Sequence, residues 1–357
     1  MGDKYLDTTV TVAISEDRQT DLATYSRDDA DFLGARMDNA PFPVPTPEYI
    51  DDSDQIGAGD EDRAGTELRL HRWPPFRIPV SGKANTQMAA RLLLRGAGGT
   101  VTNAVVSAGA VWDASAGMQK KSEGTTPVAT TMVSEDGGRR FLWPSMLVNS
   151  FGLIFSGGDP VRFESELINL GGFVPLGDIV GGFTMPEAEE YEYMHPAGCR
   201  VTFNDGVPRD YAATGRLISG RAYFTNNIDV PTLPGDTPFA DNDYATGTIS
   251  KYANRGPRGF EAGIQIYGDD TDFDELSYIL NRTPLANLTY LFRGDKITAT
   301  HYHELEVVAP LVQLRTIGRG NFNGFATLNL DFFVKPDPVT GRRFLFRVRN
   351  DGGVTFN

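Results

Sequence analysis

Hydrophobic and polar residues alternate along residues 142–169, a pattern typical of β-strands with one buried face. Two alternating runs flank Gly157, Gly158 and Asp159, so this stretch is predicted to form a β-hairpin. One face of the first strand carries Leu147, Asn149, Phe151, Leu153 and Phe155, and the return strand alternates Arg162, Glu164 and Glu166 with Val161, Phe163, Ser165 and Leu167. One side of the hairpin is therefore expected to face water.

Similar runs predict further strands along the chain. Residues 8–15 are expected to form a short first strand, and residues 200–203 and 216–226 a second hairpin-like pair. The later segments predicted as strands are 260–267, 288–292, 297–308, 311–316, 325–334 and 343–349. The 39 glycines and 22 prolines suit many turns, so we expect a β-dominated body with an antiparallel sheet.

Two segments predict helices instead. Residues 84–95 carry an apolar stripe of Ala84, Met88 and Leu92, and Gly96 is placed to end this helix. A second helix is predicted to begin at a capping box of Asp272 and Glu275 and to run over 273–281, where Thr283 and Pro284 stop it. It is expected to cover its own sheet or to lie at a subunit boundary.

The charge is concentrated at the start of the chain. Residues 1–66 hold sixteen Asp or Glu and five Lys or Arg, which supply −11 of the formal net charge of −14. Four prolines in residues 41–47 favour an extended connector. After the first strand, this region is expected to be an acidic arm that becomes ordered only against a partner. Residues 67–357 are predicted to be the folded body, with a long polar loop at 226–257.

Composition also bears on the compartment. The single cysteine, Cys199, cannot form an internal disulfide, and no secretory signal or apolar run of membrane-spanning length is found. We therefore expect synthesis in the cytoplasm and no contact with a membrane.

Catalytic and metal-binding patterns are weak. Cys199 has only His195 nearby, which we interpret as an ordinary thiol beside a surface histidine. His301 and His303 are two apart on a predicted strand and would share a face, with Glu306 pointing the other way. Two ligands without a third do not make a metal site.

The acidic run at 51–62 has calcium-loop spacing at Asp52, Asp54 and Gly57, but Ile56 and Arg63 occupy positions where ligands are required. The glycines at 96, 98 and 99 do not match a phosphate-binding fingerprint. We predict no catalytic residues, no cofactor and no metal, and hence a protein that is not an enzyme.

An acidic protein repels the phosphate backbone of nucleic acid, which argues against a sequence-specific DNA binder. The same repulsion suits a conduit through which nucleic acid must slide without sticking.

The order of elements resembles the tail tube proteins of long-tailed bacteriophages. The segments that carry this resemblance are Ile56–Gly57, Leu92–Gly99, the hairpin at 141–168, residues 215–229 and the helical FDELSYIL at 273–280 before the closing strands. The resemblance covers about residues 56–350, and it consists of patterns of strand and turn.

The resemblance implies an antiparallel β-sandwich or half-barrel with one or two flanking helices. Its protomers would assemble into six-membered rings, each with a ring-shaped β-barrel, that stack into a hollow tube of the virion tail. The tube would hold the tape-measure protein, pass the genome and contact tail terminator and baseplate or tip proteins.

The resemblance also suggests roles for particular residues. Arg162, Glu164 and Glu166 are candidates for the lumen lining, although an outward solvated face is the alternative and Arg162 departs from an acidic wall. The long loop and the arm would make contacts between rings. The candidate residues of the arm are Asp51, Asp52, Asp54, Asp60, Glu61 and Asp62.

Other functions remain open from the sequence. A tail terminator or a capsid decoration protein would share the β-rich, acidic, cysteine-poor composition. A carbohydrate-binding β-sandwich would use aromatic residues exposed on a sheet face, for which the candidates are Trp73, Trp112 and Trp143.

Overall fold

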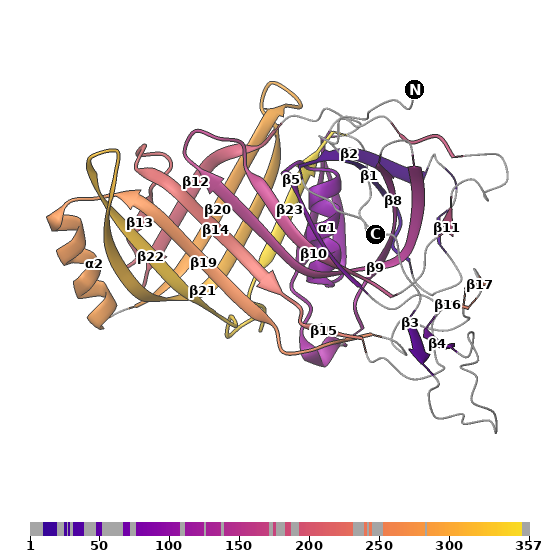
Figure 1. Cartoon of the computed structure of the whole chain (residues 1–357). Coiled ribbons are helices and arrows are strands. Elements are labelled where there is room, and N and C mark those ends of the chain that lie inside the picture. Colours follow the sequence, from indigo (N-terminus) through magenta and orange to yellow (C-terminus); the bar gives the residue numbers. More distant parts are fainter. Residues whose placement is uncertain are drawn as a thin grey trace.

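The computed structural model shows a mainly antiparallel β protein with two α-helices in its described part (Figure 1). It describes residues 10–19, 25–26, 28, 31–38, 48–51, 67–71, 76–107, 111–124, 126–136, 139–170, 174–175, 183–186, 193–230, 239–240, 243–244, 253–282 and 284–351. The fold class predicted from the alternation is confirmed to this extent. The ring assembly implied by the resemblance stays a prediction.

The first sheet is built around the predicted hairpin, which is confirmed. Strand β9 (Arg139–Ser156) pairs antiparallel with β10 (Arg162–Asn169), and the turn lies at Gly157–Asp159. This sheet has the order β5-β10-β9-β14-β19-β22, where the remaining strands are β5 (Phe76–Lys83), β14 (Leu217–Thr225), β19 (Gly259–Tyr267) and β22 (Phe325–Lys335).

The second sheet has the order β12-β20-β21-β23-β7-β6, and every neighbouring pair is antiparallel. Its strands are β12 (His195–Phe203), β20 (Leu285–Lys296), β21 (Tyr302–Phe322), β23 (Leu345–Asn350), β7 (Val111–Gly117) and β6 (Val101–Ser107). The short β13 (Pro208–Asp210) pairs with the end of β12.

The two sheets pack face to face through aromatic rings. Phe155 of β9 lies 5.1 Å from Phe292 of β20, and Phe224 of β14 lies 6.2 Å from Phe346 of β23, measured between ring centroids. All four rings are buried. Burial of such large apolar surfaces is the main favourable term that holds the sheets together.

Two long strands change partners along their length, and one of them, β21, joins the two sheets. The first half of β9 pairs with β8 (Ala129–Asp136), whereas its second half pairs with β14 along the same edge. Strand β21 likewise pairs with β23 through its first half and with β22 through its second half. The two strands predicted at 297–308 and 311–316 are thus one strand that begins at Tyr302, after a tight turn in which Ile297 donates to the carbonyl of His301.

The N-terminal region contributes to the body. Strand β1 (Val10–Ser15), predicted as 8–15, pairs with β8 and with β2 (Phe32–Met37), and its Val12, Ala13 and Ile14 are fully buried. The expectation of an unpacked arm after the first strand is therefore wrong for β2, since its apolar ends lie in the core. The small pair β3 (Glu48–Asp51) and β4 (Glu67–His71) forms a separate hairpin ladder.

Helix α1 (Met88–Ala97) lies against β9, and all ten of its residues are buried. The helix begins and ends later than the sequence predicted. Gly96 lies inside it, and Gly98 closes it in the left-handed conformation at φ 67°, where glycine is favoured. Arg95 donates to the carbonyls of Ser15 and Glu16, each at 2.7 Å, which fastens α1 to β1.

Helix α2 (Asp270–Arg282) lies at the end of the molecule far from β1, β2 and β8 (Figure 1), and only Leu276 and Ile279 are buried. Its capping pair is three residues earlier than predicted. Asp269 accepts a hydrogen bond from the Asp272 backbone at 2.9 Å, and Asp272 accepts one from the Asp269 backbone at 3.1 Å. Glu275 instead contacts Arg209.

Two other predictions need correction. Residues 200–203 and 216–226 do not form a hairpin together, because β12 pairs with β13 and β20 while β14 pairs with β9 and β19. The loop predicted at 226–257 contains the short strands β15 (Ile228–Asp229), β16 (Phe239–Ala240), β17 (Asp243–Tyr244) and β18 (Asn254–Arg255). Its other residues include 231–238 and 245–252, which lie outside the described residues.

The remaining described elements are short. Strand β11 (Val174–Pro175) pairs with the start of β9. A single 3-10 turn, η2, covers Lys121–Glu123.

Candidate functional site

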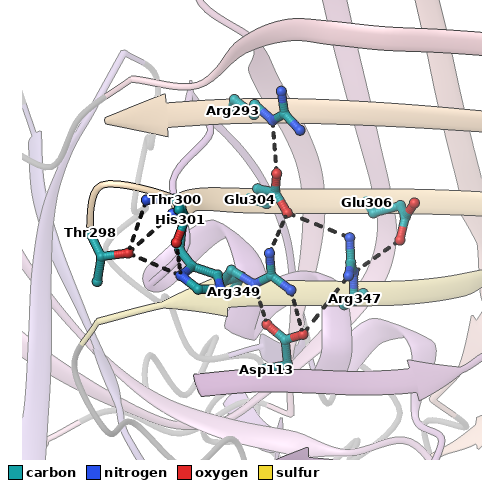
Figure 2. Close-up of polar contacts among 9 residues, drawn as sticks. All are labelled: Asp113, Arg293, Thr298, Thr300, His301, Glu304, Glu306, Arg347 and Arg349. Carbon is teal, nitrogen blue, oxygen red and sulfur yellow. Dashed lines mark hydrogen bonds and ion pairs between the residues drawn. The ribbon is translucent and has the colours of Figure 1, made fainter. Parts of the chain in front are cut away.

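An ionic row crosses the outward face of the second sheet (Figure 2). Arg293 of β20 lies opposite Glu304 of β21, Glu304 opposite Arg349 of β23, and Arg349 opposite Asp113 of β7. Four neighbouring strands thus place charges of alternating sign in one register. The adjacent positions on these strands point inward and carry the buried Phe292, Leu305, Val348 and Ala114.

The contacts within this row are close. Arg349 forms a two-point contact with Asp113, with Nε 2.7 Å from Oδ1 and Nη2 2.9 Å from Oδ2. Its Nη1 lies 3.1 Å from Oε2 of Glu304, and Nε of Arg293 lies 2.8 Å from Oε1 of Glu304. The hydrogen bonds with Asp113 raise the pKa of Arg349 above its usual value. Two-point contacts of this kind are among the stronger charge-assisted hydrogen bonds.

The Glu304 side chain is 6% exposed, although it points away from the core. Arg347 adds to its surroundings, with Nη2 3.5 Å from Glu304, and also lies 3.0 Å from Glu306. A buried carboxylate is tolerated when several donors replace water, so this row is costly to break. The row contains no nucleophile or free base. We interpret it as a structural ionic network that fixes the register of four strands.

The predicted lumen residues lie together on β10, on the outward face of the first sheet. Arg162 and Glu164 are exposed, and Glu166 is half-buried. Arg162 lies 2.8 Å from Asp38, and Glu166 lies 2.6 Å from Arg77. The alternation of these residues with buried ones on β10 is confirmed, whereas their position in a lumen stays a prediction.

The rest of this face carries both signs of charge. The register sets Arg162 in line with Ile154, Arg221, Gly263 and Asp331 across five strands. The neighbouring row holds Glu164, Gly152, Tyr223, Glu261 and Phe333. Two basic and three acidic residues thus stand among exposed apolar side chains. The face is polar and mixed, not uniformly acidic.

Of the acidic residues predicted to make contacts between rings, only Asp51 lies within the described residues. Asp51 ends β3 and is paired in register with Glu67 of β4. Asp52, Asp54, Asp60, Glu61 and Asp62 lie outside the described residues, as do Ile56, Gly57 and Arg63 of the calcium comparison.

The cysteine and histidine residues do not form a reactive site. Cys199 is buried, and burial raises the pKa of its thiol far above the usual range, whereas His195 is exposed at the start of the same strand. His301 lies in the turn before β21, where its Nδ1 is 3.0 Å from the Thr298 hydroxyl (Figure 2). His303 is buried against Thr86, so the predicted shared strand face is wrong. Among the described residues, no cluster of metal-ligating side chains is found.

An open cleft of about 660 Å³ lies at the α2 end, between the end of β19 and the β21–β22 turn. Its polar residues hold the helix start: Arg216 Nη2 lies 2.5 Å from Asp272 Oδ2, and Asp269 and Asp272 cap each other. Phe325 and Tyr267 form its aromatic wall, with ring centroids 5.9 Å apart. The polar groups already serve the helix cap, so this cleft offers little free hydrogen-bonding capacity for a ligand.

The tryptophan candidates for carbohydrate binding are not supported as a group. Trp143 is 1% exposed and donates to the Ser134 hydroxyl at 2.8 Å, so its expected exposure is wrong. Trp112 is half-buried on β7, and Trp73 lies outside the described residues.

The ionic row was missed by sequence reasoning, although a signal was present. Glu304 with Glu306 and Arg347 with Arg349 are like charges two residues apart. On a strand, each pair occupies one face, which calls for a neighbouring strand of opposite sign.

No protein-family model matches this chain, and no curated protein matches it. Within the described residues, neither helix has the length and apolar character needed to cross a membrane.

Proposed function

We propose that this chain is a structural subunit of a phage tail tube, whose copies form stacked six-membered rings in the virion. The proposal rests on the resemblance, and the observation that supports it best is the placement of the resembling segments. The hairpin at 141–168 supplies the second and third strands of the first sheet, β14, which lies within 215–229, pairs beside it, and α2 precedes the closing strands.

The role would be mechanical and not enzymatic. The tube would enclose the tape-measure protein, conduct the genome and end at terminator and baseplate or tip proteins. Its proposed lumen lining is the face of Arg162, Glu164 and Glu166. Because that face carries both signs, the negative potential of the bore would come from the net charge of −14 on every copy.

The experiment is electron microscopy of the purified full-length protein at increasing concentration. Long hollow filaments are the expected result. Single rings that never stack would favour a tail terminator instead, and protein that stays monomeric at all concentrations and ionic strengths would contradict both functions.

A further inference from the structure

Basic side chains gather around residues 117–123, at the end of β7. We call the following five residues the basic patch: Lys120, Lys121, Arg255, Arg258 and Arg342. Arg258 Nη1 donates to the carbonyl of Gln119 at 2.6 Å, and Arg255 donates to the side chain of the same Gln119. Arg342, in the turn before β23, donates to the carbonyl of Met118 at 2.7 Å. Three distant parts of the chain therefore bring positive charge to one place.

Carboxylates compensate this charge only in part. Among the described residues, Glu123 forms the ion pairs of the basic patch, with Oε1 2.8 Å from Nη2 of Arg342 and 3.9 Å from Nζ of Lys120. Asp337, in the turn of Arg342, accepts hydrogen bonds from Thr340 instead. The five basic residues and Glu123 together carry a charge of +4, on a chain whose net charge is −14.

Two arginines of the patch are held away from water without a counter-ion. Arg255 is 8% exposed, and its Nε and Nη2 have no hydrogen-bond partner. Burial, with the charge of Arg258 added, lowers the pKa of Arg255 to about 9, and burial lowers the pKa of Arg258 to about 10. Both remain charged at neutral pH. Because buried charge is poorly screened, the two cations strengthen the attraction for an anion that binds nearby.

The basic patch also reaches the surface. Lys121 is exposed, and Lys120, Arg258 and Arg342 are half-buried. Lys121 has no side-chain contact among the described residues, so its ammonium group is available to a partner. The patch therefore offers an accessible cation in front of shielded ones.

The same chain contains a segment of matching charge. The acidic run at 51–62 carries six Asp or Glu residues and no Lys or Arg. It belongs to the first 66 residues, which hold most of the net negative charge. Copies with a net charge of −14 repel one another unless opposite charges meet at their contact. Contact between the acidic run and the basic patch meets this condition.

We propose that the acidic run of one copy binds the basic patch of a second copy. Such a head-to-tail contact uses two different surfaces, so it can repeat from copy to copy. The binding itself concerns self-association in general. As a contact between the stacked rings, it rests on the proposed function.

The first test reverses the accessible charge of the patch. Lys121→Glu is expected to raise the dissociation constant of the assembly by about tenfold or more at low salt, measured by sedimentation velocity on the full chain. The control is Lys296→Glu, which makes the same change of charge at an exposed residue at the end of β20. Thermal unfolding checks that both variants fold. Equal weakening, or none, in the two variants would overturn the proposal.

The second test identifies the two contact surfaces and the copies that supply them. A carbodiimide joins a lysine amine to a carboxylate in direct contact, and it is applied to a mixture of ordinary and isotopically labelled copies. We expect cross-linked peptides that join Lys120 or Lys121 to the acidic run, with one peptide from each kind of copy. Cross-links found only within one copy would contradict the proposal, and so would the absence of these cross-links.

A control variant keeps the charge and removes the amine. Lys121→Arg should lose the cross-link at position 121 and assemble like the wild type. Weakened assembly of this variant would contradict an electrostatic role for Lys121.

The third test compares possible occupants of the patch. A synthetic peptide of residues 48–63 is expected to dissociate the assembly, whereas the same peptide with Asn and Gln in place of Asp and Glu is expected to have no effect. A single-stranded oligonucleotide that binds the patch when the acidic peptide does not would overturn the proposal in favour of nucleic acid.

These results separate this proposal from the proposed function. Filaments that form equally well with Lys121→Glu and Lys296→Glu would leave the tube proposal standing and reject the contact at the basic patch. Assembly that depends on Lys121 but yields neither rings nor filaments would support the contact and reject the tube. A wild-type protein that stays monomeric rejects the contact.

Discussion

The outward faces of the two sheets carry similar residue types, but their charged side chains differ in how far they are exposed to water. On the second sheet, Asp113, Glu304 and Arg349 form one in-register row in which the Glu304 side chain is almost buried. On the first sheet, the Arg162–Asp38 pair has side chains that are 50% and 42% exposed. Register across several strands, and not the number of charges, decides which ionic contacts are shielded from water and thus matter for stability.

The largest expected effect comes from breaking the shielded row. Arg349→Met leaves Glu304 and Asp113 with fewer partners, and we expect a loss of about 2 kcal/mol or more in the free energy of unfolding. Arg293 and Arg347 still contact Glu304, which keeps the loss below that of a fully orphaned charge. Denaturant unfolding of the two proteins measures the difference.

The matched control is Arg221→Met on the first sheet, where the arginine side chain is 57% exposed. An equal loss from both substitutions would mean that the two faces do not differ in the way proposed.

A smaller loss of stability is expected at low pH, and His303 on strand β21 is its expected source. Burial lowers the pKa of His303, while Asp351 and Asp295 oppose this shift. A base with a depressed pKa in the folded state contributes stability that is present above its unfolded pKa and is lost as pH falls through the folded value. The unfolding midpoint should therefore fall as pH drops below about 6.5.

His303→Gln should flatten that part of the pH profile, since the variant has no imidazole to protonate. A second variant, His303→Asn, also removes the imidazole and is expected to flatten the profile to the same extent. An unchanged slope in His303→Gln would assign the acid sensitivity to other groups.

The smallest change in the free energy of unfolding is expected on the outward face of the first sheet. Arg162→Met removes an exposed ion pair with Asp38 and should change the free energy of unfolding by about 0.5 kcal/mol or less at moderate salt. The unfolding midpoint should also become less dependent on ionic strength. A loss as large as that of Arg349→Met would show that this face is shielded as well.

Local features of the sequence predicted much of the fold. The β9–β10 hairpin and helix α2 follow from short-range patterns, because a turn or a cap and an apolar stripe lie within a few residues. Non-local pairing was harder to predict. Strands β12 and β14 follow each other in sequence, yet β12 pairs with β20 and β14 with β9.

The candidate sites were predicted less well for the same reason. The ionic row draws on residues 113, 293, 304 and 349, which no window of sequence contains together. Helix α1 was predicted as amphipathic, but it is buried on every side, and burial with the nearby Arg91 lowers the pKa of Arg95 to about 9. Arg91 and Arg95 are buried because strands distant in sequence cover the helix, and the sequence of the helix alone does not show this.

The contact between Asp113 and Arg349 joins residues 236 positions apart. On the ribosome, β7 is therefore made long before β23, the strand that will cover its second edge. Until translation reaches the end of the chain, the nascent polypeptide exposes this incomplete sheet. On a polysome, where several nascent copies lie close together, the incomplete sheets of neighbouring chains are therefore most exposed to incorrect pairing with one another.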